Sequence, residues 1–313
     1  MEEDDKEQND IELIDFDEEG NPIQKKEKEK PVSSNFLYHF LLIIIVIILL
    51  FIFLKIFVFN KNKIYLKFNN IEDLYRNVSE AIIYLVNKNP SANIGIVYGE
   101  PLDGIYNYLI NKYKSGEVSF KNVKFFSFDG LCGLKKDSNN SYYHFLNESF
   151  LSKIDAKEEN IYLINEEGNN KCDIDNKLEE YNEIFEKTSL DLQIILFDED
   201  GNIGFNNLNT DFDAYAHMVK LTPKDRKRIK FLFGSLEKTP LYAVTLGVKN
   251  ILQTKEIIAI GIGKDKAKVV RIITNGIFIK KYPITVLNKH RGKVTVYTDQ
   301  EGGSLVKGFY KKF

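Results

Sequence analysis

Carboxylates that follow two apolar runs are the residues of this chain whose type and place best suit proton transfer. Asp129 follows the run VKFFSF, and the acidic run Asp-Glu-Asp at 198–200 follows LQIILF. A carboxylate at the carboxyl end of a strand can act as a general base, although such a residue is more often a turn residue or a helix cap. The oxygen spacing of the acidic run does not match a helix–loop–helix calcium site.

Two glycine-containing turns bear on phosphate binding: the first favours it, and the second disfavours it. IGIGKDKA (260–267) has two glycines of a dinucleotide fingerprint but lacks the third, and its two lysines favour a less specific phosphate site at a helix start. VYGEPLDG (97–104) contains Glu100 and Pro101, which add a negative charge and remove a backbone N–H group. Taken without other information, the second loop is a turn.

The elements that would position these residues begin at Lys63, where apolar runs start to alternate with helical patterns. This alternation predicts an α/β domain with a mostly parallel sheet covered on both faces. Strands are expected at 63–68, 92–98, 123–128, 161–164, 192–197, 242–246, 257–262 and 293–298. Helices are expected at 71–85, 103–114, 141–154 and 174–187. A short helix is expected just after 246, and another after the strand at 257–262, continuing to about 274. Ligands of such sheets bind at the carboxyl ends of the strands, here loops 98–103, 129–139, 198–209 and 263–266.

Composition excludes several other functions. Residues 1–30 carry 13 acidic residues against five lysines, which leaves +6 on the rest of a chain whose net charge is −2. No basic cluster interleaved with aromatic residues exists, so nucleic acid is not expected as a partner. Two cysteines and four scattered histidines predict neither a disulfide scaffold nor a metal site, and no cofactor is expected.

The N-terminal part predicts a tail and a membrane anchor. Residues 1–35 are charged and nearly free of large apolar side chains after Phe16, which indicates a disordered acidic tail. Residues 36–59 (FLYHFLLIIIVIILLFIFLKIFVF) are long and apolar enough to cross a bilayer, and no cleavage site follows them. The alternative is a helix buried in a protein core. Four basic residues on each side of the run give no orientation by the positive-inside rule.

Two long segments resemble glucosamine-6-phosphate deaminase, a family related to 6-phosphogluconolactonase. They are KSGEVSFKNVKFFSFDGLCGLKKDSNNSYYHFLNESFLSKID (114–155) and YAVTLGVKNILQTKEIIAIGIGKDKA (242–267), and the likeness extends from about Lys63 to Phe313. The resemblance implies a Rossmann-like α/β domain at 63–313 of the sugar-phosphate isomerase and coenzyme A transferase type. It also implies a cytosolic domain, because the family's sugar phosphates are cytosolic.

The family reaction converts glucosamine 6-phosphate to fructose 6-phosphate and ammonia, and the resemblance assigns its groups to residues here. Asp129 matches the base that moves the C2 proton, and Asp200 begins the family motif Asp-Gly-His-Ile-Ala-Phe-Asn-Glu. This chain reads DGNIGFNN, so Asn202 replaces the ring-opening histidine and Asn207 replaces its supporting glutamate. An asparagine cannot carry a proton near pH 7, whereas a histidine titrates there.

The residues matching the family's phosphate site are also altered. The family's Thr/Ser-Gly-Gly-Thr loop reads Tyr-Gly-Glu-Pro at 98–101, so Gly99 is retained and Glu100 opposes a phosphate. Lys266 matches a phosphate-binding lysine, and Lys230 falls near a phosphate-binding arginine. A sugar phosphate is therefore a candidate ligand, bound by residues that differ from those of the family.

Three functions remain open. The first, which the substitutions favour, is a deaminase-like protein with impaired or lost catalysis that binds a ligand or a protein partner, itself included. The second is a working deaminase or sugar-phosphate isomerase with rearranged groups. The third is a membrane-tethered structural scaffold.

Overall fold

A computed structural model describes residues 34–57, 64–136, 138–164 and 171–306. By its internal contacts the chain divides into two units, Met1–Lys61 and Asn62–Phe313. The predicted acidic tail lies outside the described residues except for its last two positions, as do residues 58–59 of the predicted anchor and the Lys63 start of the predicted domain.

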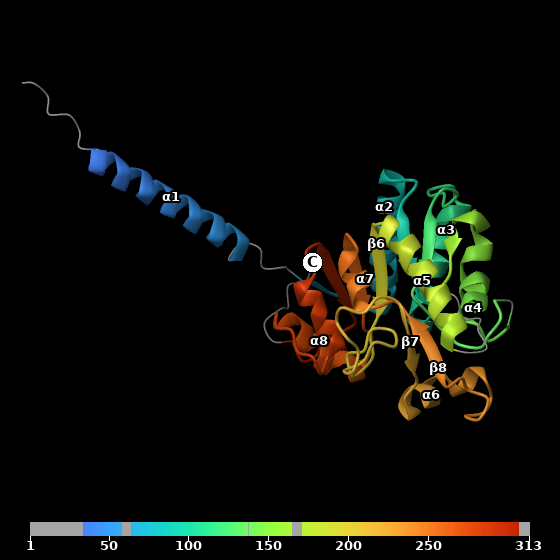
Figure 1. Cartoon of the computed structure of the whole chain (residues 1–313). Helices are drawn as coiled ribbons and strands as arrows, with labels where there is room; N and C mark the ends of the chain where they lie inside the picture. Colours follow the sequence, from blue (N-terminus) through green and yellow to red (C-terminus); the bar gives the residue numbers. More distant parts are fainter. Residues whose placement is uncertain (1–33, 58–63, 137, 165–170, 307–313) are drawn as a thin grey trace, which may run out of the picture. The chain divides into compact units, whose positions relative to one another are not determined.

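The first unit contains one described helix, α1, at Ser34–Phe57 (Figure 1). Side chains within α1 are described for Asn35 and for residues 38–51, and these are exposed. In the part of the chain that the structure describes, no helix is both long enough and apolar enough to cross a membrane.

The centre of the second unit is a sheet that contains seven strands in the described ranges, all of them parallel to their neighbours. In spatial order the strands are β1 (Ile64–Phe68), β10 (Lys293–Thr298), β9 (Glu256–Ile260), β6 (Leu192–Leu196), β2 (Asn93–Ile96), β3 (Lys124–Ser127) and β5 (Ile161–Tyr162). The predicted strands at 63–68, 92–98, 123–128, 161–164, 192–197, 257–262 and 293–298 are confirmed in this sheet.

Consecutive residues of the inner strands are buried, which shows that both faces of the sheet are covered. Ile194 and Ile195 of β6 point to opposite faces and are each at most 1 % exposed. Such strands read as continuous apolar runs, the pattern typical of buried parallel sheets. Gly95 in β2 leaves room for the Gln193 side chain of the adjacent strand, since a Cβ at Gly95 would lie 2.0 Å from Gln193 Oε1.

The helices of the second unit follow the predicted periodicity. Their bounds are α2 (Ile71–Lys88), α3 (Asp103–Lys114), α4 (Tyr142–Ser149), α5 (Lys171–Lys187), α7 (Val248–Gln253) and α8 (Ala267–Thr274). In α2, the buried residues Leu74, Val78 and Ile82 share one face, and the Asn70 side chain caps the first turn by accepting from the N–H of Asp73 at 2.8 Å. The helix expected at 141–154 is shorter, because α4 ends at Ser149 and a 3₁₀ turn follows.

A second, antiparallel sheet corrects one expectation. The run at 242–246 was expected to join the parallel sheet, but it forms β8 (Tyr242–Thr245) between β4 (Asp129–Leu131) and β7 (His217–Lys220). An apolar run indicates a buried strand without telling which sheet receives it. Figure 1 shows β7 and β8 beside α6 (Pro223–Ile229), a short charged helix that the sequence reasoning did not predict.

Candidate functional site

Asp129 lies where the chain leaves the large sheet and enters the small one. It is the first residue of β4 and pairs with Thr245 of β8 through the backbone. Asp129 is 7 % exposed, and within the described chain its carboxyl group forms no hydrogen bond. Burial raises the pKa of the Asp129 carboxyl to about 7, and the Arg228 guanidinium opposes that rise only in part. A carboxyl group with a pKa near neutrality suits a general base.

Asp198, which directly follows the run ending β6, organises the neighbouring turn. Its Oδ1 accepts hydrogen bonds from the backbone N–H groups of Asp200 and Asn202, each at 2.9 Å. Its Oδ2 accepts from Asn202 Nδ2 and from Arg228 Nη1, each at 2.8 Å. Gly201 makes the turn possible because its φ of +73° is a conformation that favours glycine. The Asn202 side chain is thus held by the Asp198 carboxylate. Asp198 follows β6, which is two strands from β3, the strand that precedes Asp129.

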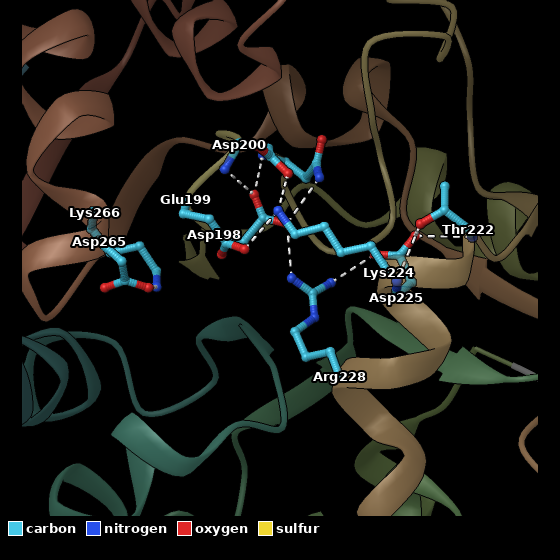
Figure 2. Close-up of polar contacts among 10 residues, drawn as sticks. Asp198, Glu199, Asp200, Thr222, Lys224, Asp225, Arg228, Asp265 and Lys266 are labelled. Carbon is cyan, nitrogen blue, oxygen red and sulfur yellow. Dashed lines mark hydrogen bonds and ion pairs between the residues drawn. The ribbon is translucent and has the colours of Figure 1, made fainter. Parts of the chain in front are cut away.

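Helix α6 directs two cations at this turn. Thr222 and Asp225 form a capping box that fixes the start of the helix. Lys224 and Arg228 are four residues apart, so they lie on one face of α6, and Figure 2 shows both reaching the turn at 198–200. Arg228 also donates to Asp225 Oδ1 at 3.0 Å, which makes the guanidinium a bridge between helix and turn.

The two other acidic residues of the turn are more exposed and share one partner. Lys224 Nζ forms ion pairs with Asp200, whose side chain is 56 % exposed, and with Glu199 at 2.7 Å. These hydrogen bonds raise the pKa of Lys224, the Asp200 contact contributing most. The hydrogen bond from Lys224 is also the main cause that lowers the pKa of Glu199. Asp200 is therefore held at the surface by a cation of the chain itself.

The loop after β9 contains Lys266, whose side chain is 18 % exposed and forms an ion pair with Asp265. Lys266 is close enough to Glu199 to add to the lowering of that pKa, so it belongs to the same edge of the sheet. The backbone N–H of Gly263, which a bound phosphate would need, donates to Asp299 Oδ1 at 2.9 Å. An internal carboxylate thus caps this glycine turn.

The loop after β2 is negatively charged. Gly99 is extended, and its carbonyl accepts the N–H of Leu102 at 2.9 Å, which starts a 3₁₀ turn at Glu100–Leu102. Burial and then the repulsion from Glu100 raise the pKa of Asp103. Half-buried Tyr98 stacks on Phe145 with ring centroids 4.6 Å apart. This loop presents carboxylates and an aromatic ring.

The remaining residues predicted from the sequence lie apart from these contacts. Asn207 is half-buried, and its Oδ1 accepts the N–H of Asn209 at 2.9 Å, so its side chain closes a local turn. Lys230 is exposed, and in the described chain it forms no hydrogen bond or ion pair with the residues of the turn at 198–202. Among the described residues, no group of three or more His, Cys, Asp or Glu side chains is placed to hold a metal ion.

The sequence reasoning missed three partners, Asp198, Lys224 and Arg228. Asp198 was noted only as part of an acidic run, and Arg228 is 30 residues away, between 197 and 242, where no helix or strand was expected. The signal that could have found them is the Thr-Pro-x-Asp start of α6 at 222–225, which predicts a capped helix. That helix would have placed Lys224 and Arg228 on one face.

The second unit is an α/β domain whose parallel strands carry their polar residues at the carboxyl ends, the edge at which such sheets bind ligands. The family model of glucosamine-6-phosphate isomerases/6-phosphogluconolactonase matches residues 69–296. The chain belongs to this family, as the resemblance in the sequence predicted.

Named relatives support the assignment. The chain is 33 % identical over 238 residues to a glucosamine-6-phosphate deaminase of Thermoanaerobacter sp. (strain X514), covering 76 % of this chain and 92 % of the relative. It is 31 % identical over 243 residues to that of Clostridium novyi (strain NT), covering 76 % of this chain and 98 % of the relative. A solved monomeric glucosamine-6-phosphate deaminase superposes with a TM-score of 0.73 at 27 % identity, covering 77 % of this chain and all of that one.

The 6-phosphogluconolactonases share the fold more distantly. The enzyme from Trypanosoma brucei superposes with a TM-score of 0.65 at 15 % identity, covering 78 % of this chain and 98 % of that one. The Rossmann-like α/β fold expected from the resemblance is therefore confirmed.

Proposed function

We propose that this chain is a membrane-anchored, glucosamine-6-phosphate deaminase-like protein whose ring-opening step is impaired or lost and which binds a ligand or a partner. The observation that carries the proposal is the residue type and the hydrogen bonding of Asn202. Its amide stands where the family resemblance puts a histidine, and it donates to Asp198 at 2.8 Å. An amide cannot deliver or accept a proton near neutral pH, and loss of a positioned acid–base group costs ~10²–10⁴ in rate.

The second damaged position supports the same proposal. Asn207, at the place of the supporting glutamate, uses its side-chain oxygen for the N–H of Asn209. Glu100 and Asp103 add negative charge where the resemblance puts the phosphate loop. Asp129 and Lys266 remain, so the site keeps a base and a cation without the group that opens the sugar ring.

A coupled ammonia assay on the full chain in detergent tests the proposal. With glucosamine 6-phosphate, we expect release at least ~10² below that of an ordinary family member. The matched variant carries Asn202→His and Asn207→Glu together with a Thr-Gly-Gly-Thr loop at 98–101. Asp198 already lies at hydrogen-bond distance from the side chain at 202, so the introduced imidazole would face a carboxylate. Activity only in this variant supports the proposal, and ordinary turnover by the unmodified chain contradicts it.

One observation favours the second candidate, a working deaminase or isomerase with rearranged groups. The buried Asp129 carboxyl, with its pKa raised to about 7, is suited to moving a proton at C2 of an open-chain sugar. If this candidate is right, the unmodified chain turns over glucosamine 6-phosphate and Asp129→Asn abolishes the reaction. Turnover that survives Asp129→Asn would remove the candidate.

The anchor is the remaining part of the proposal. Residues 36–59 supply a bilayer-length apolar run, and a helix spans Ser34–Phe57. We expect the full chain to resist carbonate extraction from membranes, and complete transfer to the supernatant would contradict the anchor. For the domain we propose the cytosolic side. Glycosylation at the sequons of Asn77, Asn139 or Asn147 would place it on the opposite side.

A further inference from the structure

The cations at the carboxyl edge of the sheet are already paired with carboxylates of the chain. Lys224 pairs with Glu199 and Asp200, and Lys266 pairs with Asp265. Arg228 pairs with Asp198 and with Asp225 (Figure 2). A ligand phosphate would therefore compete with an internal carboxylate at each of these three cations.

These ion pairs differ in how easily an anion could displace the carboxylate. The carboxylate partners Asp200 and Asp265 are 56 % and 55 % exposed, so water screens them and their side chains are free to turn away. The Asp198 side chain is 10 % exposed and accepts four hydrogen bonds, two of them from backbone N–H groups. A carboxylate fixed by its own turn cannot move aside without breaking that turn.

Arg228 is also the cation that acts on Asp129, since its charge partly offsets the effect of burial on that pKa. Its side chain is 38 % exposed and so remains accessible to a ligand. An arginine beside the retained base is a natural bidentate partner for a phosphate, and Asp198 takes that place.

The loop after the neighbouring strand β2 disfavours anions as well. The loop after β2 presents Glu100 and Asp103, and the Tyr98 ring stacks on Phe145 and lies 5.3 Å from Tyr142. Tyr98 thus packs within the protein, whereas Glu100 and Asp103 are exposed and can accept hydrogen bonds from hydroxyl groups. These groups suit a polyhydroxy compound that carries no phosphate.

We propose that Asp198 is a specificity-determining residue: by holding Arg228 it excludes phosphate esters from this site, which takes an unphosphorylated sugar. The inference rests on the proposed function, because it names the ligand class of a site that has lost the family's ring-opening group. The variant Asp198→Asn keeps the Oδ1 acceptor for the turn and removes the charge that holds Arg228. Asp225→Asn is the matched control, since it makes the same charge change on the other partner of the same guanidinium.

Calorimetric titration of the full chain in detergent at neutral pH tests the proposal with inorganic phosphate, glucosamine 6-phosphate and glucosamine as probes. We expect the unmodified chain to bind glucosamine in preference to its 6-phosphate. In Asp198→Asn, affinity for phosphate and for glucosamine 6-phosphate should rise about 10-fold or more, as a charge-assisted hydrogen bond becomes available. In Asp225→Asn, where Asp198 still holds the guanidinium, the gain should be clearly smaller. Circular dichroism confirms that both variants are folded.

Four outcomes overturn the proposal. They are tighter binding of glucosamine 6-phosphate than of glucosamine by the unmodified chain, no gain in Asp198→Asn, equal gains in both variants, and no binding of any probe in any variant. Failure here is distinct from failure of the proposed function. If the unmodified chain released ammonia at an ordinary rate, the proposed function would fail, whereas a missing gain in Asp198→Asn without ammonia release overturns only the role of Asp198.

Discussion

Asp129 and Asp198 are nearly equally buried, at 7 % and 9 % exposed, yet their surroundings are opposite. Asp129 has no hydrogen-bond donor for its carboxyl group among the described residues, and burial raises its pKa to about 7. Asp198 receives two backbone and two side-chain donors, one of them from Arg228. The donors around each carboxyl group, and not the depth of burial, distinguish the two sites.

This difference separates two roles within one family site. A carboxyl group without donors is free to exchange a proton with a ligand, whereas one that accepts four hydrogen bonds fixes the chain around it. Asp129 is the residue that the family resemblance assigns to proton transfer. Asp198 fixes the turn at 200–202, the start of the segment that matches the family motif. One carboxyl group is thus without hydrogen-bond donors among the described residues, and the other is held in an ion pair with Arg228.

The largest effect on stability is expected from Asp129→Asn. Because the folded pKa of about 7 lies above the ordinary value of 3.8, the unfolded chain binds fewer protons between these pH values, and stability falls as pH rises through this window. Below pH ~4 the carboxyl contributes nothing, and above ~7 the loss is complete, on the order of 4 kcal/mol. Asparagine removes this loss.

Urea denaturation of both proteins at pH about 4.5 and about 8 measures the change, with the pKa window setting the two conditions. We expect the free energy of unfolding of Asp129→Asn, relative to the unmodified chain, to increase by several kcal/mol toward the higher pH. Any pH-independent effect of introducing the amide is the same at both pH values, so it cancels when the two differences are compared. A difference that does not depend on pH would show that Asp129 ionises as readily in the folded chain as in the unfolded one.

Asp198→Ala should have the next largest effect, in the opposite direction. It removes the acceptor of four hydrogen bonds and leaves Arg228 without its less exposed partner. We expect a loss of about 3 kcal/mol in the free energy of unfolding, since two backbone N–H groups and two side chains lose their acceptor while Arg228 keeps Asp225 as a partner. Asp198→Asn, which retains the acceptor for the turn, should lose clearly less. Equal losses in the two variants would mean that the backbone contacts contribute little.

Much of the fold could be predicted from the sequence because its signals are local. Apolar runs such as EIIAI and LQIIL form β9 and β6, and the helical face of Leu74, Val78 and Ile82 packs as its spacing predicts. The small antiparallel sheet could not be predicted. Its strands are short, and the partner of Asp129 is Thr245, which lies more than a hundred residues away in the sequence.

The site was less predictable than the fold, for a physical reason. Residue type and motif identified Asp129, Asp200, Asn202 and Lys266 as candidates, but no local pattern reveals which cation neutralises which carboxylate. Asp198 meets Arg228 only because α6 is capped at Thr222 and returns to the end of β6. Lys230, which the resemblance places near a phosphate-binding arginine, lies two residues further on and is exposed. Helical periodicity distinguishes Arg228, which shares a face of α6 with Lys224, from Lys230.

The smallest effect is expected at Lys224, which extends the comparison to the exposed part of the same turn. Its side chain is 53 % exposed, and its partners Glu199 and Asp200 are 35 % and 56 % exposed. Lys224→Met keeps most of the methylene groups and removes the charge. Because exposed ion pairs gain little over hydrated ions, we expect a loss below ~1 kcal/mol in the free energy of unfolding.

Salt provides the discriminating measurement. At about 1 M sodium chloride the Debye length falls to ~3 Å, so the cost of Lys224→Met should nearly vanish. The cost of Asp198→Ala should remain, since lost hydrogen bonds to backbone N–H groups are not screened by ions. If Lys224→Met costs as much as Asp198→Ala and resists salt, then the exposed pairs hold the turn together. In that case the distinction between a buried, four-fold bonded Asp198 and an exposed Asp200 fails, and an anion would find Lys224 no easier to reach than Arg228.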